Sequence, residues 1–516
     1  MNAGSGLSFS NVTGSGHEPS SILYPKTSAE IVEIVQEARR SKTPLYPVST
    51  GLNWGYGSQS PIVPESVVVK LSEMRGILNA DEISIDHPIA LIEPGVTQGQ
   101  LSEFLSKRCP ELTFNVTGSS AKTSIIGCAL DRGVGYFGPR KEDIFGLEFV
   151  AGTGEVIRTG FRRLGDDSPL AQCHPYGLGP IIDGLLFQSN YGIVTSACLS
   201  LRQRRPVEVA VSLSLRNPRD LGAFITELAR LKREGLLTSV THIGNRDRNH
   251  STLMYGITKY LEKSCGLSSS QAEEEARKAL SLLAPHEWTS LASVTGNKGQ
   301  VKACLAEIRS RTKHLARLLV VTSRKLDLGF SVMHALRFIS LARSQAAAIH
   351  AMRPLHDLAL GKPTDLPIQN LLWKFKHPNL DPVELDMSDC GLLFVNPALP
   401  LDGEIIADVV DEMRSIGRRY NHPLYMTLNI ETNTSLVAVV NLLFNRADQA
   451  EVRRAHECAS ALLDYILSVG LAPYRARVDM MGRIVSEDDP FWIKARDLKK
   501  VFDPDNIISP GRYNLL

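Results

Sequence analysis

PVSTGLNWGYGS, residues 47–58, places three glycines, small hydroxyl side chains and an asparagine within twelve positions. Such a loop exposes successive backbone N–H groups, which can form a nest for an anion such as a pyrophosphate. An ordinary surface loop is the alternative. However, the aromatic side chains of Trp54 and Tyr56 need a surface to pack on, and a flat cofactor ring or ring-shaped substrate would supply one. The stretch therefore predicts either a plain loop or a nucleotide-binding loop.

A second run of small residues, TGSSAKTSIIG at 117–127, offers donors suited to phosphate or ribose oxygens. Taken alone, it is equally well explained as a loop that lets neighbouring elements pack closely. Two such runs in one stretch, followed by Asp183-Gly184-Leu185 and QSNYGI at 188–193, favour a wrapped nucleotide cofactor. The G-x-G-x-x-G match at 133–138 follows Asp131-Arg132 rather than an apolar strand, so it is only a weak indication of a Rossmann fold.

The chain divides into three stretches with different patterns. Residues 1–205 combine helices with short strands separated by glycines, and capping boxes at Thr27 and Thr97 predict two helix starts. Residues 206–470 begin with an alternating strand at 207–215 and an amphipathic helix over 221–231. Their last part has the order β-α-β-β-α, with strands at 391–395, 424–430 and 436–443 and helices at 404–416 and 450–469, which predicts an α+β domain. Residues 471–516 end in turn sequences that suit a segment closing over a finished site.

Composition and charge exclude several classes of protein. Of the 516 residues, 43% are apolar and 22% charged, as in ordinary globular proteins. Lys plus Arg number 57 and Asp plus Glu 55, and the formal net charge of +2 gives no global field for nucleic acid or an anionic membrane. No apolar run approaches the roughly 20 residues that span a bilayer. We therefore expect neither a nucleic-acid partner nor a membrane.

The N-terminal sequence and the cysteines indicate a cytoplasmic protein. Residues 1–16, MNAGSGLSFSNVTGSG, lack the basic start and apolar segment of a secretory signal and predict a flexible leader. None of the eight cysteines forms a C-x-x-C pair, which argues against a zinc knot and favours reduced thiols. Neither H-E-x-x-H nor G-x-S-x-G occurs, so the sequence predicts no metal site and no serine hydrolase.

Tyr474 and Arg475 form another candidate site. They follow a long predicted helix at 450–469, and a phenol beside a guanidinium can bind an anion, for which a phenolate is one option. A solvated basic end of the helix is the alternative.

Seven segments, taken in order, give the chain a resemblance to a known family. They are PVSTGLNWGYGS (47–58), LIEPGVT (91–97), SIIGCALDRGVGYFGP (124–139), HPYGLGPIIDGLLFQSNYGIVT (174–195), CGLLFVNP (390–397), PYR (473–475) and VFDPDNIISPGRY (501–513). Together they resemble the vanillyl-alcohol oxidase/p-cresol methylhydroxylase (PCMH) family of FAD enzymes, also known for 4-cresol dehydrogenase. The resemblance runs from about Pro25 to the C-terminus.

The resemblance implies a two-domain α+β fold of the PCMH type. Residues 1–205, completed by residues 471–516, would form the FAD-binding domain. Residues 206–470 would form a cap domain, an antiparallel sheet covered by helices, that holds the substrate. The implied cofactor-binding residues are Pro47, Ser49, Thr50, Gly51, Leu52, Asn53, Trp54, Gly55, Tyr56, Gly57, Pro94, Gly95, Thr117, Gly118, Ser119, Thr123, Ser124, Ile126, Gly127, Gly184, Asn190, Gly192, Ile193 and Arg512.

The resemblance also implies a chemistry. In the 4-alkylphenol oxidisers of this family, two tyrosines and an arginine stabilise the substrate as a phenolate, and these match Tyr56, Tyr474 and Arg475. Charge-assisted hydrogen bonds to the oxyanion lower its pKa. The electron-rich phenolate would then lose hydride from its benzylic carbon to flavin N5 and become a p-quinone methide, while the flavin carries the redox chemistry.

Three departures from the family pattern shape these expectations. Leu392 stands near the position where relatives link the flavin covalently, so noncovalent FAD is favoured, with Cys390 the remaining candidate for a linkage. The segment after Gly135-Tyr136 is shorter than in relatives, so we expect Glu142 or Asp143 to be the acidic group nearest flavin N5. Trp373-Lys374 replaces a Trp-Arg pair of close relatives. Together, the three departures favour a larger phenolic natural product over p-cresol or vanillyl alcohol as the substrate.

The leading hypothesis is therefore a flavoenzyme that oxidises a phenolic C–H or C–OH centre. An alcohol, sugar or 2-hydroxy-acid oxidase, and a flavin-binding protein without catalysis, are the alternatives. Oxygen, a cytochrome partner or a diffusible molecule would serve as electron acceptor. Relatives commonly form dimers, so a homodimer is one expectation.

Overall fold

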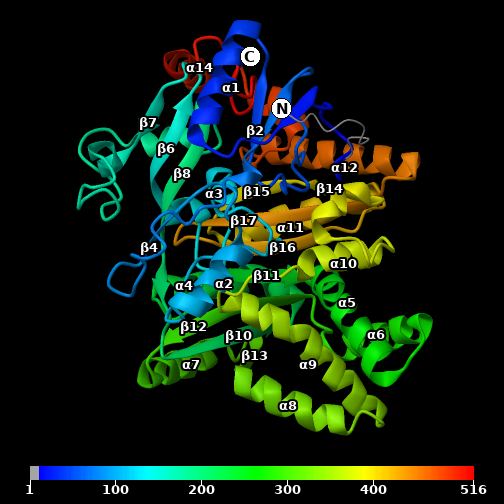
Figure 1. Cartoon of the computed structure of the whole chain (residues 1–516). Coiled ribbons are helices and arrows are strands. Elements are labelled where there is room, and N and C mark those ends of the chain that lie inside the picture. The colour runs from blue at the N-terminus through cyan, green and yellow to red at the C-terminus, as the bar shows by residue number, and fades with distance from the viewer. Residues whose placement is uncertain (1–10) are drawn as a thin grey trace.

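The computed structural model describes residues 11–516 (Figure 1). Within them, nine strands form one antiparallel sheet, which we call the large sheet. Its order is β13 (Ala316–Val321), β10 (Val207–Leu215), β12 (Trp288–Gly296), β11 (Thr241–Asn245), β16 (Tyr425–Ile430), β17 (Ser435–Asn445), β15 (Asn396–Pro400) and β18 (Ala472–Arg475), with β14 (Cys390–Phe394) also paired to β17.

The period-two pattern of the strands gives the large sheet two different faces. In β10, Val209, Val211, Leu213 and Leu215 lie in the main hydrophobic core, whereas the residues between them line a cavity on the other face. The alternation continues in β17, whose core-facing residues are Leu436, Ala438, Val440, Leu442 and Phe444. The sheet therefore separates a helix-covered core from the cavity.

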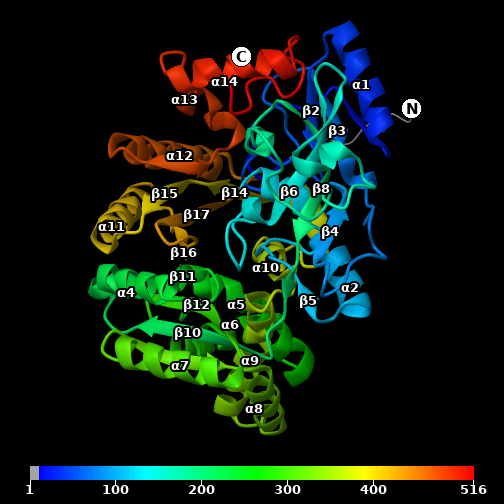
Figure 2. The ribbon, with the colours of Figure 1, turned by 90° about the vertical axis from the view of Figure 1, so that its left-hand side faces the viewer.

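Four helices cover the core face of the large sheet. They are α4 (Leu221–Arg233), α7 (Lys298–Thr312), α11 (Gly403–Arg419) and α12 (Gln449–Ser468). Figure 2 shows these helices along one side of the sheet, with β2, β6 and β8 on the other side. Helices α4, α11 and α12 form where the sequence pattern predicted helices, and each presents an apolar face to the core.

A second group of helices lies beside the cavity face. Its members are α5 (Arg246–Cys265), α6 (Ser269–Leu283), α8 (Ser323–Ala335), α9 (Ser340–Ala359) and α10 (Leu366–Lys374). Helix α5 contacts β11, β12 and β16, and α9 contacts β12. These helices and the large sheet therefore enclose the cavity from two directions.

Residues before β10 form smaller sheets. Strands β1 (Ser21–Leu23), β3 (Val67–Lys70) and β2 (Leu45–Val48) are parallel. Strands β4 (Ile89–Ile92), β8 (Gly192–Ser200), β6 (Ile144–Ala151) and β7 (Val156–Arg158) are antiparallel, and β5 (Leu112–Thr113) pairs with β9 (Arg202–Gln203). Helices α1 (Ser28–Ser41), α2 (Gln98–Arg108) and α3 (Ile125–Leu130) connect them.

Both predicted helix starts are confirmed, with one difference in detail. Thr27 caps α1 and Thr97 caps α2 through their side-chain oxygens. In neither helix does the N3 side chain bond the backbone N–H of the N-cap residue, as a full capping box requires. Instead, Glu30 accepts from the backbone N–H of Lys26, and Gln100 donates to the carbonyl of Arg75. One cap bond is therefore enough to begin each helix.

The last stretch of the chain crosses between the sheets. Strand β18 extends the large sheet as far as Arg475, beyond residue 470. Helices α13 (Met481–Ile484) and α14 (Pro490–Phe502) follow, and α14 packs against the part of the chain that holds β6 and β8. The carbonyl of Ser509 then accepts from Asn190, which brings the C-terminal residues beside β8.

The leader expected over residues 1–16 is partly wrong. Residues 1–10 lie outside the described residues, but Asn11, Val12 and Thr13 are buried. The Val12 N–H donates to Asp386 and Leu392 donates to the Val12 carbonyl, so this segment is fixed by specific hydrogen bonds. The Gly- and Ser-rich composition of the segment did not reveal these partners.

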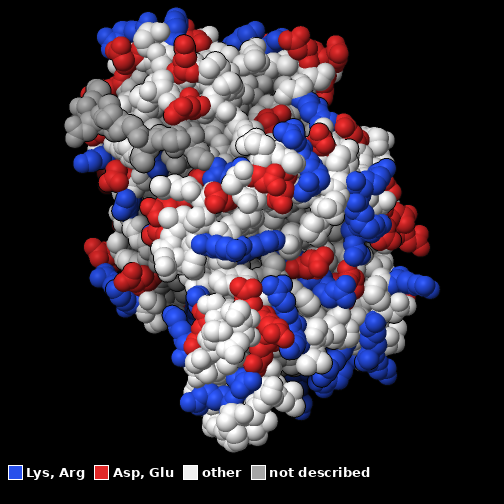
Figure 3. All heavy atoms as spheres, turned by 90° about the vertical axis from the view of Figure 1, so that its right-hand side faces the viewer, with Lys and Arg blue, Asp and Glu red and all other residues white. Residues whose placement is uncertain are grey.

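The surface agrees with the balanced composition. Figure 3 shows Lys and Arg interspersed with Asp and Glu over one face of the molecule. Among the described residues, no helix has the length and apolar character needed to cross a membrane.

Candidate functional site

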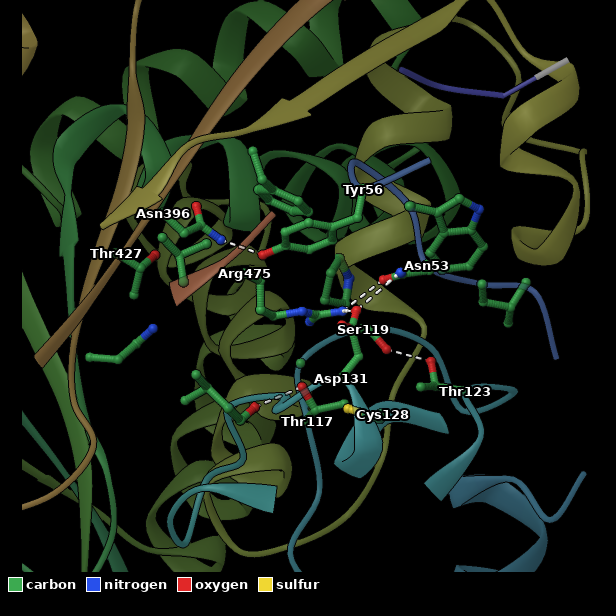
Figure 4. Close-up of a pocket in the computed structure, with 18 of the residues that line it drawn as sticks. Asn53, Tyr56, Thr117, Ser119, Thr123, Cys128, Asp131, Asn396, Thr427 and Arg475 are labelled. Carbon is green, nitrogen blue, oxygen red and sulfur yellow. Dashed lines mark hydrogen bonds and ion pairs between the residues drawn. The ribbon is translucent and has the colours of Figure 1, made fainter. Parts of the chain in front are cut away.

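A cavity of about 670 Å³ lies between the large sheet and the loops that precede it. This volume falls in the range of about 300–1,000 Å³ that is common for ligand sites. Loops 46–58 and 117–136 form one wall, and strands β10, β11, β16 and β17 form another. Figure 4 shows side chains from both walls pointing toward one another.

Most of the predicted cofactor-binding residues line this cavity. The lining members are Pro47, Ser49, Thr50, Gly51, Leu52, Asn53, Trp54, Tyr56, Pro94, Thr117, Gly118, Ser119, Thr123, Ser124, Ile126, Gly127, Gly192, Ile193 and Arg512. Two stretches more than fifty residues apart in the sequence therefore meet at one site.

Five predicted residues lie outside the cavity lining. They are Gly55, Gly57, Gly95, Gly184 and Asn190. A Cβ atom on Gly95 would lie 2.5 Å from the Met74 carbonyl oxygen, so glycine is needed there for close backbone packing. Gly55 has a positive φ of 75° and packs against Phe394.

The backbone of the lining loops suits a pyrophosphate. Among the described residues, no acceptor is recorded for the N–H groups of Gly51, Leu52, Asn53 and Trp54, or for those of Gly118 and Ser119. All six residues line the cavity, so their N–H groups can bind an acceptor placed there. The indole Nε1 of Trp54 is also buried without a partner. The chemistry of these donors fits the phosphates and ring edges of a dinucleotide cofactor.

Tyr56, Tyr474 and Arg475 line the same cavity. The Arg475 guanidinium lies 4.1 Å from the centre of the Tyr56 ring, a cation–π contact. The Tyr56 hydroxyl accepts from Asn396 Nδ2 at 2.5 Å, and the Tyr474 hydroxyl donates to Glu431 Oε1 at 3.1 Å. The structure thus brings the trio together, with each hydroxyl bonded to a polar neighbour.

Arg475 also forms an ion pair that the sequence did not suggest. Its Nη2 bonds Asp131, and it donates to Asn53 Oδ1 at 2.7 Å (Figure 4). Arg512 Nη2 lies 3.6 Å from the other oxygen of Asp131. Burial opposes the charge of the Asp131 carboxylate, but Arg475 and Arg512 outweigh it and hold the pKa of Asp131 below its usual value. Two cations and one anion leave this corner with a net positive charge.

The carboxyl of Glu431, which accepts from the Tyr474 hydroxyl, has a shifted pKa. Its side chain is 4% exposed, and burial raises its pKa to about 7, against the opposing effect of the Tyr474 hydrogen bond. A carboxyl that titrates near neutral pH can exchange a proton with its hydrogen-bond partner under ordinary conditions. Glu431 follows a strand that the sequence predicted, but an acidic residue after a strand is too common a pattern to single out.

Glu142 and Asp143 lie outside the cavity lining. Asp143 accepts from Asn115 Nδ2 at 2.9 Å, and burial raises its pKa to about 6. Glu142 is exposed and pairs with Lys141. The structure therefore does not bring these carboxyls among the lining residues, and their closeness to flavin N5 stays a prediction.

Leu392 lines the cavity, whereas Cys390 does not. The Cys390 thiol is fully buried, and burial raises its pKa to about 12. A thiol is nucleophilic as the thiolate, which this environment disfavours.

Sequence reasoning missed four residues that complete the site. They are Cys128, Asp131, Asn396 and Glu431, and Cys128, Asp131 and Asn396 line the cavity. Nothing in the local sequence of Asp131 showed that it would be largely buried and would therefore need a cationic partner.

Comparison with known proteins extends the geometric result. Residues 19–160 match the family model described as an FAD binding domain. The 4-cresol dehydrogenase (hydroxylating) flavoprotein subunit of Pseudomonas putida is 24% identical over 98% of this chain and 89% of its own length. The crystal structure of p-cresol methylhydroxylase with substrate bound has the same fold, with a TM-score of 0.78 and 21% identity over 98% of this chain and 91% of that one.

This chain has a PCMH-type fold with an FAD binding domain and is homologous to the 4-cresol dehydrogenase flavoprotein subunit. Another relative of this PCMH-type protein is the 1'-carboxy-chondrochloren decarboxylase of Chondromyces crocatus, 29% identical over 96% of this chain and 91% of the relative. The structure of 4-ethylphenol oxidase from Gulosibacter chungangensis also has a TM-score of 0.78, with 21% identity over 96% of this chain and 90% of that one. The expected family, fold, FAD cofactor and enzyme class are thereby confirmed.

Proposed function

We propose that this PCMH-type enzyme oxidises a phenolic substrate of the 4-alkylphenol class, which it binds as a phenolate. The observation that carries this proposal is the meeting of Tyr56, Tyr474 and Arg475 in one cavity with the predicted FAD-binding loop. FAD supplies the two-electron acceptor when it is bound. The protein's own residues supply the position, the charge and a route for the phenolic proton.

The positive charge of Arg475 and Arg512 favours an oxyanion beside Tyr56. An opposite charge at about 4–6 Å lowers the pKa of a phenol, and the excess of one positive charge at this corner acts in that direction. Tyr474 bridges the substrate side of the cavity to Glu431. A phenolic proton can therefore pass through the Tyr474 hydroxyl to the Glu431 carboxylate, which accepts it at or above neutral pH.

The phenolate is electron-rich at the carbon para to its oxygen. Loss of one proton and two electrons, the equivalent of a hydride, from the benzylic carbon of the phenolate gives a neutral p-quinone methide, and water or an internal group then adds to that electrophile. The Chondromyces crocatus relative is named for a decarboxylation in a chondrochloren compound, which supports a larger natural product as the substrate. The Pseudomonas putida relative is named as a subunit, which supports a protein electron acceptor such as a cytochrome.

The proposal also includes noncovalent FAD, a homodimer and a cytoplasmic location. Leu392 at the cavity wall and the un-ionised Cys390 thiol support noncovalent binding. All eight cysteines, which lie within residues 11–516, are free thiols, as in cytoplasmic proteins.

The test compares flavin reduction by a phenol and by its O-methyl ether in anaerobic stopped-flow measurements. In the wild-type enzyme, the phenol should reduce the flavin and the ether should not, because the ether cannot ionise. Tyr474→Phe should slow reduction by roughly 10- to 150-fold, since a hydrogen bond to a charged group is worth about 1.5–3 kcal/mol. Arg475→Ala should slow it further.

The matched control is Tyr425→Phe. It removes a hydroxyl that accepts from Lys374 at 2.6 Å outside the cavity lining, so flavin reduction should not change. Equal reduction by phenol and ether would refute the phenolate proposal and favour an alcohol, sugar or 2-hydroxy-acid oxidase.

A further inference from the structure

A second polar region of the cavity contains Arg248, Tyr136 and His242. Arg248 is the third residue of α5, His242 lies on β11, and Tyr136 lies on the turn after α3. The Tyr136 and His242 rings pack with their centroids 4.3 Å apart. None of the three belongs to the phenolate trio or to the predicted FAD-binding residues.

Arg248 holds a positive charge without a protein counterion. Among the described residues, its guanidinium has no ion pair and no hydrogen bond, although it lines the cavity. Arg246, two positions earlier on the same helix, pairs with Glu287 at 3.5 Å. Arg248 is only partly buried, and a guanidinium that lines a cavity without a counterion can pair there with an anionic group of a ligand.

The neighbours of Arg248 cannot supply the missing negative charge. Burial raises the pKa of Tyr136 to about 12, so its phenol stays neutral. Burial lowers the pKa of His242 to about 4, so its ring stays neutral as well, with Nδ1 held 2.6 Å from Asn429 Oδ1. Burial also lowers the pKa of Arg248, and only Tyr136 acts in the opposite direction.

The wall next to Arg248 is largely apolar. Leu253 and Ile257 follow it along α5, and Met352 and Leu355 face the same cavity from α9. One fixed cation at the edge of an apolar surface suits a ligand that has an apolar arm and one anionic group. A carboxylate matches the planar donor fork of a guanidinium, as a phosphate does.

We propose that Arg248 binds the carboxylate of an acidic substrate, so that the enzyme acts on phenolic acids rather than on neutral phenols. This inference rests on the proposed function for the phenol end of the substrate. A phosphate of FAD is the other source of an anion in this cavity. The unpaired N–H groups of Gly51–Trp54 and of Gly118 and Ser119 already provide phosphate donors, which leaves Arg248 for the substrate.

The test measures binding apart from turnover. Holoenzyme is reduced with dithionite, and anaerobic calorimetry gives the Kd of three probes: 4-hydroxyphenylacetate, 3-(4-hydroxyphenyl)propanoate and 4-(4-hydroxyphenyl)butanoate, each with its methyl ester. Wild type should bind at least one acid 10-fold or more tightly than its ester. Arg248→Gln should raise the Kd of that acid by roughly 10- to 150-fold and leave the Kd of its ester unchanged. Arg248→Lys should recover part of the difference.

Arg246→Gln is the matched control, because it removes the same charge from the same turn of α5 outside the cavity. It should change neither the Kd of the acids nor the Kd of FAD. Equal Kd values of acid and methyl ester for all three probes in the wild-type enzyme would overturn the inference. A rise in the Kd of FAD in Arg248→Gln, without a change in the acid preference, would also overturn it and assign Arg248 to the cofactor phosphate.

A further arm separates this inference from the proposed function. 3-Phenylpropanoate has the carboxylate without the phenol. If it binds as tightly as the hydroxylated acid, and Arg248→Gln weakens it equally, the carboxylate site stands and the phenolate proposal fails. If the phenolic esters alone bind well, the phenolate site stands and the role of Arg248 is refuted.

Discussion

The change Asp131→Asn removes the one negative charge between Arg475 and Arg512. The exposed fractions of the three side chains are 16%, 14% and 9%, so this is a nearly buried ionic cluster. Breaking a buried pair by removing one partner typically costs about 3–5 kcal/mol, because an uncompensated charge remains buried. Here two guanidinium groups remain, and each disfavours the charge of the other. We therefore expect a loss of stability near the upper end of that range.

Asp505→Asn is the control for this experiment. Asp505 also pairs with two cations, Arg39 at 2.9 Å and Lys42 at 2.6 Å, but the exposed fractions of those partners are 37% and 67%. Exposed pairs contribute about 0–1 kcal/mol. Denaturant unfolding followed by tryptophan fluorescence should therefore separate the two variants by several kcal/mol.

The same change should have an opposite effect on the substrate. Without the Asp131 carboxylate, the field of Arg475 acts fully on an oxyanion, so the pKa of a bound phenol should fall. The pH profile of flavin reduction by a phenol reports this shift. If Asp131→Asn costs no more stability than Asp505→Asn, or if the profile moves to higher pH, then our account of the cluster is wrong.

Three further predictions follow from the site. Burial raises the pKa of Glu431 to about 7, so between about pH 4.5 and 7 the folded protein keeps a proton that the unfolded chain loses. The free energy of unfolding should therefore fall as the pH rises through this range, and Glu431→Gln should flatten that fall in unfolding titrations. Gly95→Ala places Cβ 2.5 Å from the Met74 carbonyl oxygen, so it should lower the free energy of unfolding by about 1–3 kcal/mol and weaken FAD binding. At Gly184 an added Cβ meets nothing within 4 Å, so Gly184→Ala should change neither the stability nor the Kd of FAD. Acid precipitation should release all FAD into the supernatant, because Leu392 cannot form a linkage; flavin fluorescence that stays with the denatured chain would contradict this.

Local patterns in the sequence were sufficient for much of the fold. The period-two alternation of β10 and the amphipathic spacing of α4 depend on neighbouring residues alone, and both elements form where they were expected. The glycines of the 47–58 loop likewise predicted the part of the chain that lines the cavity. The division into domains at about residues 205 and 470 stays a prediction, although β18 continues the large sheet to Arg475.

The charge partners within the site were decided by tertiary structure. Asp131 and Arg475 are separated by most of the chain, and neither residue's local sequence says which buried charge will neutralise it. The same holds for Glu431, whose pKa depends on burial and on the Tyr474 hydroxyl, and for Arg248, which is distinctive only because no carboxylate packs against it within the described chain. Secondary structure follows from short-range sterics and hydrophobic periodicity, whereas electrostatics at a site depends on distances that only the folded chain defines.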